Sequence, residues 1–187
     1  MQHERRKQAY DNWSQQYDKN ENRTRDLEAI ALREILSKTS FEHCLETGCG
    51  TGKNTQWLIT KVSHVTAVDL STAMLQKAKE KIDNDCVEFI QADITKDWTF
   101  IHQQYDIVSF SLVLEHIENL EDILHKTASV LKPGGCVYIG ELHPFKQYAG
   151  SKARFETTEG LQIVTCFNHH ISDFLSPAKK KVLICQA

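Results

Sequence analysis

The stretch 44–55, CLETGCGTGKNT, contains three of the eight glycines in the chain, Gly48, Gly50 and Gly52. The apolar residues before these glycines are typical of a buried strand, and residues 52–62, GKNTQWLITKV, are typical of a helix. Glycines at such a junction allow a tight turn, and because they lack a Cβ atom they let a ligand lie close to the backbone. The stretch therefore predicts an α/β fold with a ligand site at the carboxyl end of its first strand.

The rest of the chain continues the alternation of strands and helices that a parallel sheet with crossover helices requires. We expect strands at 43–47, 64–69, 86–91, 105–111 and 136–142. We expect helices at 8–17, 24–37, 52–62, 71–82 and 120–131. Ser71 is a good N-cap for the fourth helix, and the run Lys132-Pro133-Gly134-Gly135 ends the fifth. The predicted fold class is a Rossmann-like, doubly wound α/β fold, with a mostly parallel sheet and helices on both faces.

At 187 residues the chain has the length of a single domain, 1–187. Within it we expect N-terminal helices at 1–40, a ligand-binding core at 41–142, a substrate-side loop or cap at 143–168, and a C-terminal helix with a last strand at 169–187. The predicted elements after the core are a strand in LQIVTCF (161–167), a helix in ISDFLSPAKK (171–180) and a strand in KVLICQA (181–187).

The composition is that of a globular protein without an unusual partner. Charged residues make up 25% of the chain and hydrophobic residues 41%, with a net charge of −3, so nucleic acid is an unlikely partner, although a local basic patch remains possible. We expect a cytoplasmic protein, because the N-terminus lacks the apolar core of a secretory signal and no apolar run is long enough to cross a membrane. The six cysteines form no C-x-x-C pair, which favours reduced thiols.

Three consecutive predicted strands end in an acid, Glu46, Asp69 and Asp93. Asp69 follows Gly48 by 21 residues, where a carboxylate can accept hydrogen bonds from both hydroxyls of a ribose. Asp93 could accept from the amino group of adenine. Asp69 taken alone could also be only the N-cap of the next helix, but together with the glycine turn the acids favour a nucleoside ligand.

The glycine spacing argues against a dinucleotide. The fingerprint for a pyrophosphate is G-x-G-x-x-G, whereas this chain has G-x-G-x-G with Glu46 two positions before the first glycine. An anion would be poorly stabilised beside that carboxylate. The pattern therefore favours a nucleoside that carries a positive charge.

Five segments then resemble, in order and with the expected spacing, the class I S-adenosylmethionine-dependent methyltransferases. They are ETGCGTG, AVDLSTAML, QADI, YDIVSFSLVLEHI and LKPGGCVYIGE, and the resemblance covers roughly residues 8–145. It implies a single methyltransferase domain that uses S-adenosyl-L-methionine and releases S-adenosyl-L-homocysteine. Members of this family have a seven-stranded sheet, so the single strand expected after the last helix predicts an incomplete C-terminal hairpin.

The resemblance also implies which residues hold the cofactor. The glycines would face its methionine part, Glu46 would help to hold the amino group directly or through water, and Asp69 would bind the ribose. Ser111 and Leu112 would lie near the sulfonium. Tyr17 could close over the cofactor, or it could simply be a helix packing residue. The full implied set is Tyr17, Glu46, Gly48, Cys49, Gly50, Gly52, Asp69, Leu70, Met74, Asp93, Ile94, Ser111 and Leu112.

Methyl transfer from a sulfonium is an in-line displacement, so a general base is needed only when the acceptor arrives protonated. Histidine suits that role because its pKa lies near neutrality. We expect His143, at the end of the fifth strand, as the first candidate and His116 as the second, with His169 and His170 as further possibilities. Each could equally be a structural or surface histidine. No pair has the spacing of a preformed metal site, so no metal is expected.

The acceptor is expected to be a small molecule, and the protein a monomer or a homodimer. The chain has SLVL at 111–114 where enzymes that methylate DNA bases resemble one another in N/D-P-P-Y/F. Lys146, Lys152 and Arg154 could bind a carboxylate on the acceptor, or could be a solvated loop. Two other functions stay open on the sequence, a nicotinamide-dependent oxidoreductase and a catalytically weak protein that only binds S-adenosylmethionine.

Overall fold

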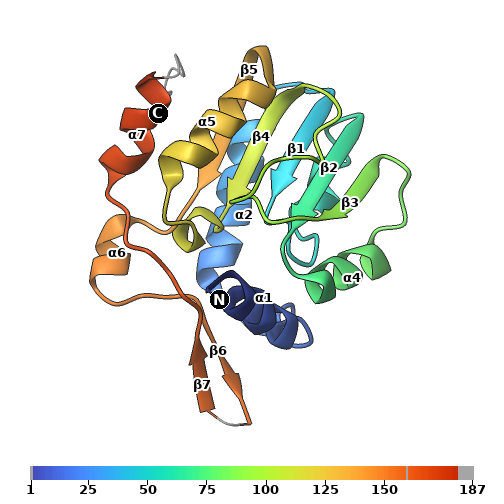
Figure 1. The fold of residues 1–187 in the computed structure, drawn as a ribbon. Helices are drawn as coiled ribbons and strands as arrows, with labels where there is room; N and C mark the ends of the chain where they lie inside the picture. The colour runs from blue at the N-terminus through green and yellow to red at the C-terminus, as the bar shows by residue number, and fades with distance from the viewer. Residues whose placement is uncertain (1, 159, 181–187) are drawn as a thin grey trace.

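The centre of the protein is a five-stranded parallel sheet. The computed structural model describes residues 2–158 and 160–180. The strands are β1 (His43–Thr47), β2 (His64–Asp69), β3 (Val87–Gln91), β4 (Tyr105–Ser111) and β5 (Leu131–Gly140), in the order β3-β2-β1-β4-β5 (Figure 1). The strand order reverses between β1 and β4, so their carboxyl ends form the switch point where ligands bind in doubly wound folds. The predicted fold class is confirmed.

Each strand sends alternate side chains to two separate cores, as the pleat of a sheet requires. In β1, Cys44 packs on one face and Leu45 on the other; in β4, Ile107 and Val108 divide in the same way. One face is covered by α2 (Arg23–Leu36), α3 (Thr55–Leu58) and α4 (Thr72–Lys81). The opposite face is covered by α5 (Leu120–Val130), against which α7 (Ile171–Lys180) packs.

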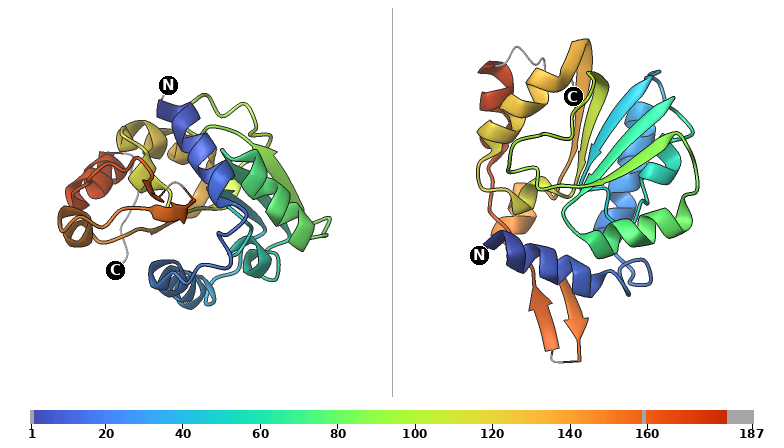
Figure 2. Two further views of the ribbon diagram at one scale, coloured as in Figure 1. Left: turned by 90° about the horizontal axis from the view of Figure 1, so that it is seen from below. Right: turned by 45° about the vertical axis from the view of Figure 1, so that its right-hand side comes forward.

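The remaining elements lie at the carboxyl edge of the sheet. Helix α1 (Gln2–Trp13) runs across this edge and contacts α4, as Figures 1 and 2 show. A short 3-10 helix, η1 (Leu114–His116), follows β4, and α6 (Pro144–Tyr148) follows β5. The antiparallel hairpin of β6 (Arg154–Thr157) and β7 (Gly160–Ile163) extends beyond α1. Its Phe155 stacks on Trp13 at 4.9 Å between ring centroids, which joins the hairpin to α1.

Most predicted elements are present, but the third helix and the fifth strand have other bounds than predicted. The fourth helix has Ser71 as its N-cap, as predicted, with the Ser71 hydroxyl accepting from the Met74 amide. The third helix, however, is confined to four residues and continues only as turns to Val62. The fifth strand begins five residues earlier than predicted, because Lys132–Gly135 form a bulge inside the strand rather than a turn before it.

The N-terminal helices also differ from the prediction. Helix α1 begins at Gln2 and ends at Trp13, so Tyr17 lies in the turn after it. Four apolar residues at helical spacing indicate α2 in the sequence. Three of them, Leu27, Ile30 and Ile35, are exposed, with Leu27 68% accessible, and the fourth, Ala31, is half-buried. A second row, Ala29, Leu32 and Leu36, packs on the sheet instead.

The C-terminal elements are described in part. The predicted strand 161–167 is observed as β7, which ends at Ile163, and the predicted helix is α7. The strand predicted at 181–187 lies outside the described residues. Among the residues that are described, no helix is both long and apolar enough to span a lipid bilayer.

Candidate active site

A cavity lies at the carboxyl ends of β1, β2 and β4, and two residues of α1 line part of it. Ten of the thirteen residues expected to bind the cofactor line it: Tyr17, Gly48, Gly50, Asp69, Leu70, Met74, Asp93, Ile94, Ser111 and Leu112. The other three, Glu46, Cys49 and Gly52, do not. The structure therefore brings most of the predicted set together in one place, although the set comes from four strands and the segments that follow them.

The three glycines of the turn all have positive φ, but their surroundings differ. Gly50, with φ of 55°, has no atom within 4 Å of where a Cβ would stand, so its backbone lies bare toward the cavity. Gly52, by contrast, would place a Cβ 2.9 Å from Ile82 on the α4 side. Gly52 does not line the cavity and is needed for close packing of the turn, so a contact between Gly52 and a ligand stays a prediction.

Asp69 connects the first two strands at the edge of the cavity. Its Oδ2 accepts from the Gly50 amide at 2.8 Å and its Oδ1 from the Ser71 amide at 2.8 Å. Burial raises the pKa of this carboxyl to about 6, against the lowering effect of those amides. Each carboxylate oxygen has two lone pairs, so both can still accept from a second donor. This arrangement suits a ribose, whose two neighbouring hydroxyls need two acceptors.

Beyond Asp69 the cavity becomes an apolar slot that ends at another acid. The slot is lined by Val68, Leu70, Met74, Ala92 and Ile94. At its end the Oδ1 of Asp93 accepts from the amide and hydroxyl of Thr95, while its Oδ2 lies 3.0 Å from His3 Nδ1. A flat aromatic base fits an apolar slot with a polar end.

Glu46 does not line the cavity, and its part in holding the amino group of the cofactor stays a prediction. It is buried beside the turn, and its Oε2 accepts from the Thr55 hydroxyl at 2.5 Å. Burial raises the pKa of Glu46 to about 8, and the nearby carboxylate of Glu28 adds to that rise. The residue therefore supports the glycine turn from behind. Cys49 is likewise buried and lies outside the cavity wall.

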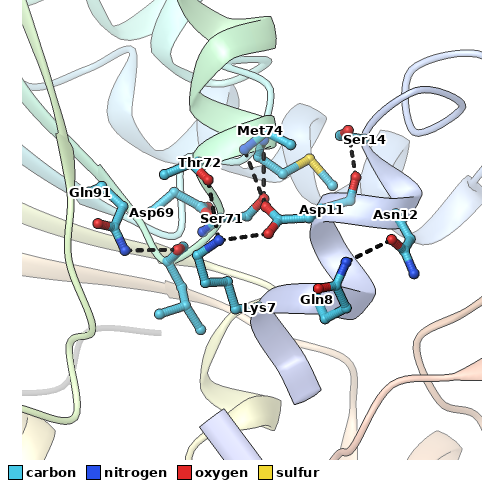
Figure 3. A network of polar contacts seen from close by, with 12 residues as sticks. Lys7, Gln8, Asp11, Asn12, Ser14, Asp69, Ser71, Thr72, Met74 and Gln91 are labelled. Carbon is cyan, nitrogen blue, oxygen red and sulfur yellow. Dashed lines mark hydrogen bonds and ion pairs between the residues drawn. The ribbon is translucent and has the colours of Figure 1, made fainter. Parts of the chain in front are cut away.

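Helix α1 is attached over the cavity by a polar network, shown in Figure 3. Asp11 accepts from the Ser71 hydroxyl at 2.6 Å and from the Ala73 amide at 3.2 Å, both at the start of α4. Its other oxygen pairs with Lys7 at 2.6 Å, and Lys7 also donates to the hydroxyl of Thr72. Two groups of α1 thus bind the segment that directly follows Asp69.

The same helix narrows the cavity. Arg6 and Tyr10 line it, and Arg6 also donates to the backbone carbonyl of His116 on the opposite side. The free volume that remains is about 90 Å³. Sites for ligands of drug size are typically about 300–1,000 Å³. The side chains present suit a nucleoside, but a shift of α1 is needed to admit one.

His116 lines the cavity, but both of its ring nitrogens are engaged. Nδ1 lies 2.8 Å from the Thr165 carbonyl, which can only accept, so Nδ1 carries the proton. Nε2 then accepts from the Tyr10 hydroxyl at 2.6 Å. Burial lowers the pKa of His116 to about 4, which keeps the ring neutral. Glu115 and Cys166 place ligand atoms within 4.8 Å of this ring, but its nitrogens are not free to bind a metal.

His143 lies away from the site. Its side chain is exposed and caps α6, with Nδ1 accepting from the Phe145 amide at 3.1 Å. It lines neither of the two cavities that flank Leu112. His169 contacts the carbonyl of Ile117, and His170 is exposed. The structure thus gives His143 a capping role and offers no support for its predicted catalytic one.

The loop after β4 has features that the sequence prediction missed. Leu112 has φ of 54°, a conformation rarely adopted outside glycine, and it separates the cofactor cavity from a second cavity. Glu141 holds this loop, since its Oε1 accepts from the amides of Val113 and Leu114 at 2.9 and 2.7 Å. Burial raises the pKa of Glu141 to about 8. The sequence could have indicated Glu141, because it is an acid near the end of the predicted fifth strand.

Tyr10 and Arg6 were also missed. Tyr10 precedes Tyr17 by seven residues, a helical spacing that would place both rings on one side. The observed structure brings both rings to the cavity, although only Tyr10 belongs to α1. Arg6 gives no comparable signal, because it lies in a polar run in which any residue could face solvent.

Comparison with known proteins shows to which family the chain is similar. A family model described as a methyltransferase domain matches residues 45–139. A malonyl-[acyl-carrier protein] O-methyltransferase of Haemophilus ducreyi is 31% identical over 121 residues, covering 62% of this chain and 46% of the relative. A demethylmenaquinone methyltransferase of Leptospira interrogans is 37% identical over 111 residues, covering 56% and 45%. The chain thus spans about half the length of these curated relatives.

Solved structures agree with the fold. The complex titled DhpI-SAH has a TM-score of 0.78 at 24% identity, and the alignment covers 96% of this chain and 87% of that one. The complex titled DhpI-SAM-HEP has a TM-score of 0.74 at 27% identity, covering 92% and 86%. Because the family model matches just over half of the chain and the sheet has the expected topology, the chain belongs to the methyltransferase domain family, within the class I S-adenosylmethionine-dependent methyltransferases.

Proposed function

We propose that the protein binds S-adenosylmethionine in the cavity beneath α1 and catalyses transfer of its methyl group to a small-molecule acceptor. One observation carries the proposal. The bare backbone of Gly50, at the carboxyl end of β1, is hydrogen-bonded to Asp69 at the tip of β2, and both line a cavity that continues into an apolar slot. A nucleoside with a charged, flexible tail has the polar and apolar parts that this surface matches.

Each part of the cavity has a role in this proposal. Asp69 accepts from the ribose hydroxyls, and the slot with Leu70, Met74 and Ile94 holds the adenine. Gly50 leaves room for the methionine part. Ser111 and Leu112, at the end of β4, border the reacting end. The fold contributes one further support, because ligands of doubly wound sheets bind outside the carboxyl ends of the strands, at the switch point.

The cofactor supplies a methyl group on a sulfonium, and the protein supplies position and a dry site. In-line displacement requires the acceptor atom, the methyl carbon and the sulfur to be collinear. The rigid ends of β1, β2 and β4 can hold one partner, while α1 and the hairpin exclude water above it. His116 takes part through Tyr10, whose hydroxyl it orients by accepting its hydrogen bond.

The names of the relatives support a small acceptor. They describe methylation of malonyl-[acyl-carrier protein], of demethylmenaquinone and, for a relative from Hydrogenovibrio crunogenus that is 29% identical over 76% of this chain and 60% of its own, an O-methylation in ubiquinone biosynthesis. The acceptors differ, so the family alone does not choose among them.

Calorimetry with S-adenosylmethionine, S-adenosylhomocysteine and NAD tests the cofactor part of the proposal. We expect both sulfur compounds to bind and NAD to bind far more weakly. Formation of S-adenosylhomocysteine with a panel of small hydroxy, amino and carboxylic compounds then tests transfer. Preference for NAD would overturn the proposal, while cofactor binding without turnover on any compound would favour a protein that only binds S-adenosylmethionine.

A further inference from the structure

A second cavity adjoins the proposed cofactor site. It has a volume of about 360 Å³, which is within the range typical of small-molecule sites. Tyr10, Tyr17 and Leu112 line both cavities, so these three side chains form the wall between them. The rest of its wall comes from Trp13 at the end of α1, from residues 21–25 around the start of α2, from η1, from Leu142 after β5 and from the segment that leads into β6. A molecule bound there would lie next to the end of β4, where the methyl group is proposed to be transferred.

The wall of the second cavity carries three cations from two separate parts of the chain. Lys152 and Arg154 come from the cap and are exposed, and neither forms an ion pair with any described residue. Arg25 comes from α2. Its guanidinium donates to the carbonyls of Tyr17 and Asn20 at 2.7 and 2.8 Å, and neither carbonyl neutralises its charge.

The acids of the same wall do not balance these charges. Glu21 is exposed, and Glu115 is only 7% accessible. The three cations Arg25, Lys152 and Arg154 thus outnumber the two acids of the wall, even with both acids ionised. The cavity is therefore positively charged in a protein whose net charge is −3. This contrast favours an anionic ligand.

The buried carboxyl of Glu115 is a second feature of the cavity that points to a ligand. Its Oε2 is buried and has no hydrogen-bond partner among the described residues by geometry, and the residue lines the cavity. The nearby thiol of Cys166 is the one described side chain that lowers the pKa of this carboxyl, against the effect of burial. An unpaired buried acceptor destabilises the protein, and a donor from a ligand would remove that cost. The other oxygen lies 3.8 Å from His116 Nε2, which is too far for a hydrogen bond. The arrangement leaves one acceptor for a hydroxyl or an amine.

We propose that this second cavity is the acceptor site and that the acceptor is a small anion, bound through its carboxylate or phosphate by Lys152 and Arg154 and through its hydroxyl or amine by Glu115. This inference rests on the proposed function. In the reaction, the carbon–sulfur bond breaks and leaves its electron pair on sulfur, a bond from carbon to the acceptor oxygen or nitrogen forms, and the acceptor proton passes to the Glu115 carboxylate.

Binding to the protein saturated with S-adenosylhomocysteine tests the anionic part. The probes are hydroxy acids, amino acids and phosphate monoesters of two to eight carbons, each paired with the neutral amide or alcohol of the same shape. We expect at least one carboxylate or phosphate to bind about tenfold more tightly than its neutral counterpart, as a charge-assisted hydrogen bond implies. Comparing the two headgroups then tells which anion is preferred.

Paired substitutions locate the site. The double variant K152Q/R154Q should weaken binding of the preferred anion by about tenfold or more, while affinity for S-adenosylhomocysteine stays unchanged. Lys146→Gln is the matched control, because Lys146 is an exposed cation of the same cap that does not line the cavity. Equal binding of neutral and anionic probes, no binding of any anion, or no effect of the double variant would overturn the inference. Failure to bind S-adenosylhomocysteine would instead overturn the proposed function.

Glu115→Gln tests the proton acceptor separately. With an anionic acceptor that the wild type methylates, we expect kcat to fall by about a hundredfold and KM to change little, since the amide cannot take a proton. The wild-type rate should rise with pH as Glu115 ionises, and the variant should lose that limb of the profile. A variant with unchanged kcat and an unchanged pH profile would overturn the role of Glu115.

Discussion

Asp69 is the residue on which the proposed cofactor site depends most. It accepts one backbone amide on each oxygen and is proposed to accept both ribose hydroxyls. We expect Asp69→Ala to weaken binding of S-adenosylhomocysteine by about 1–3 kcal/mol in calorimetry, through the loss of those hydrogen bonds. Asp85→Ala, at an exposed acid far from the cavity wall, is the control. Unchanged affinity in the Asp69 variant would mean that the ribose lies elsewhere.

The same carboxyl predicts a pH dependence of cofactor affinity. Its pKa is raised to about 6 by burial, so it is ionised at pH 7.5 and largely protonated at pH 5. A protonated carboxyl is a weaker acceptor than a carboxylate. Affinity for S-adenosylhomocysteine should therefore fall as the pH decreases through about 6. Asp69→Asn should bind more weakly but with a flatter profile, and a wild-type profile that is already flat would contradict the assignment.

Tyr10 and His116 form a pair whose function depends on the neutral ring. Tyr10→Phe leaves the buried Nε2 of His116 without its donor, which should cost about 1–3 kcal/mol in the free energy of unfolding, measured with urea. Tyr148→Phe removes a hydroxyl from an exposed ring and should change stability little. A Tyr10 variant as stable as the wild type would mean that the hydrogen bond is not formed in solution.

At the scale of elements, α1 acts as the cover of the cofactor cavity, and Asp11 is its main attachment to α4. Because the free volume under α1 is only about 90 Å³, the cofactor cannot enter without a shift of the helix. Asp11→Ala removes the contacts to Ser71, Ala73 and Lys7. We expect S-adenosylhomocysteine to associate faster with this variant in stopped-flow measurements, and to dissociate faster as well.

Asn12→Ala is the control for that experiment. Asn12 is exposed on the same helix and bonds only to Gln8 within it, so its loss should weaken α1 slightly without releasing it from α4. Equal association rates for the Asp11 variant and the wild type would show that α1 does not limit entry.

The helices and strands also show how much of the fold could be predicted from the sequence. Short apolar runs between helical segments indicated the strands, because a parallel sheet that is buried on both faces needs apolar side chains along most of each strand. The bulge at Lys132–Gly135 was missed because proline and paired glycines are typical of turns as well as of bulges. The exposed row of Leu27, Ile30 and Ile35 shows a different limit: α2 carries two apolar rows, and only packing against the sheet selects one.

For the site, strand-tip acids and glycines were predictable because a parallel sheet brings its carboxyl ends to one edge. The side chains that other segments of the chain bring to those strand ends could not be predicted. Tyr10 reaches the cavity through the path of α1, and Glu46 turns away from it toward Thr55. His143 became a helix cap because Pro144 follows it. Such outcomes depend on contacts between distant segments, which one sequence without its relatives does not reveal.

Several acids are buried in the protein, and because burial raises their pKa values, the stability of the protein depends on pH. Glu46, Asp69 and Glu141 all have their pKa raised by burial, two of them to about 8 and Asp69 to about 6. Since an unfolded glutamate titrates near 4.5, the folded protein holds more protons than the unfolded chain between about pH 4.5 and 8. The free energy of unfolding therefore falls as the pH rises through that window, by up to about 1.4 kcal/mol per pH unit for each such proton.

Glu46→Gln isolates one of these contributions. Glutamine keeps the acceptor for the Thr55 hydroxyl but has no charge to bury. In urea unfolding without cofactor, the variant should gain stability relative to the wild type as the pH rises from 5 to 9, and the difference should level off above about 8, where Glu46 is ionised in both states of the wild type. Glu34→Gln, at an exposed position, should give a nearly constant difference. A constant difference for Glu46→Gln as well would show that Glu46 is already ionised at pH 5, and that burial does not control its proton.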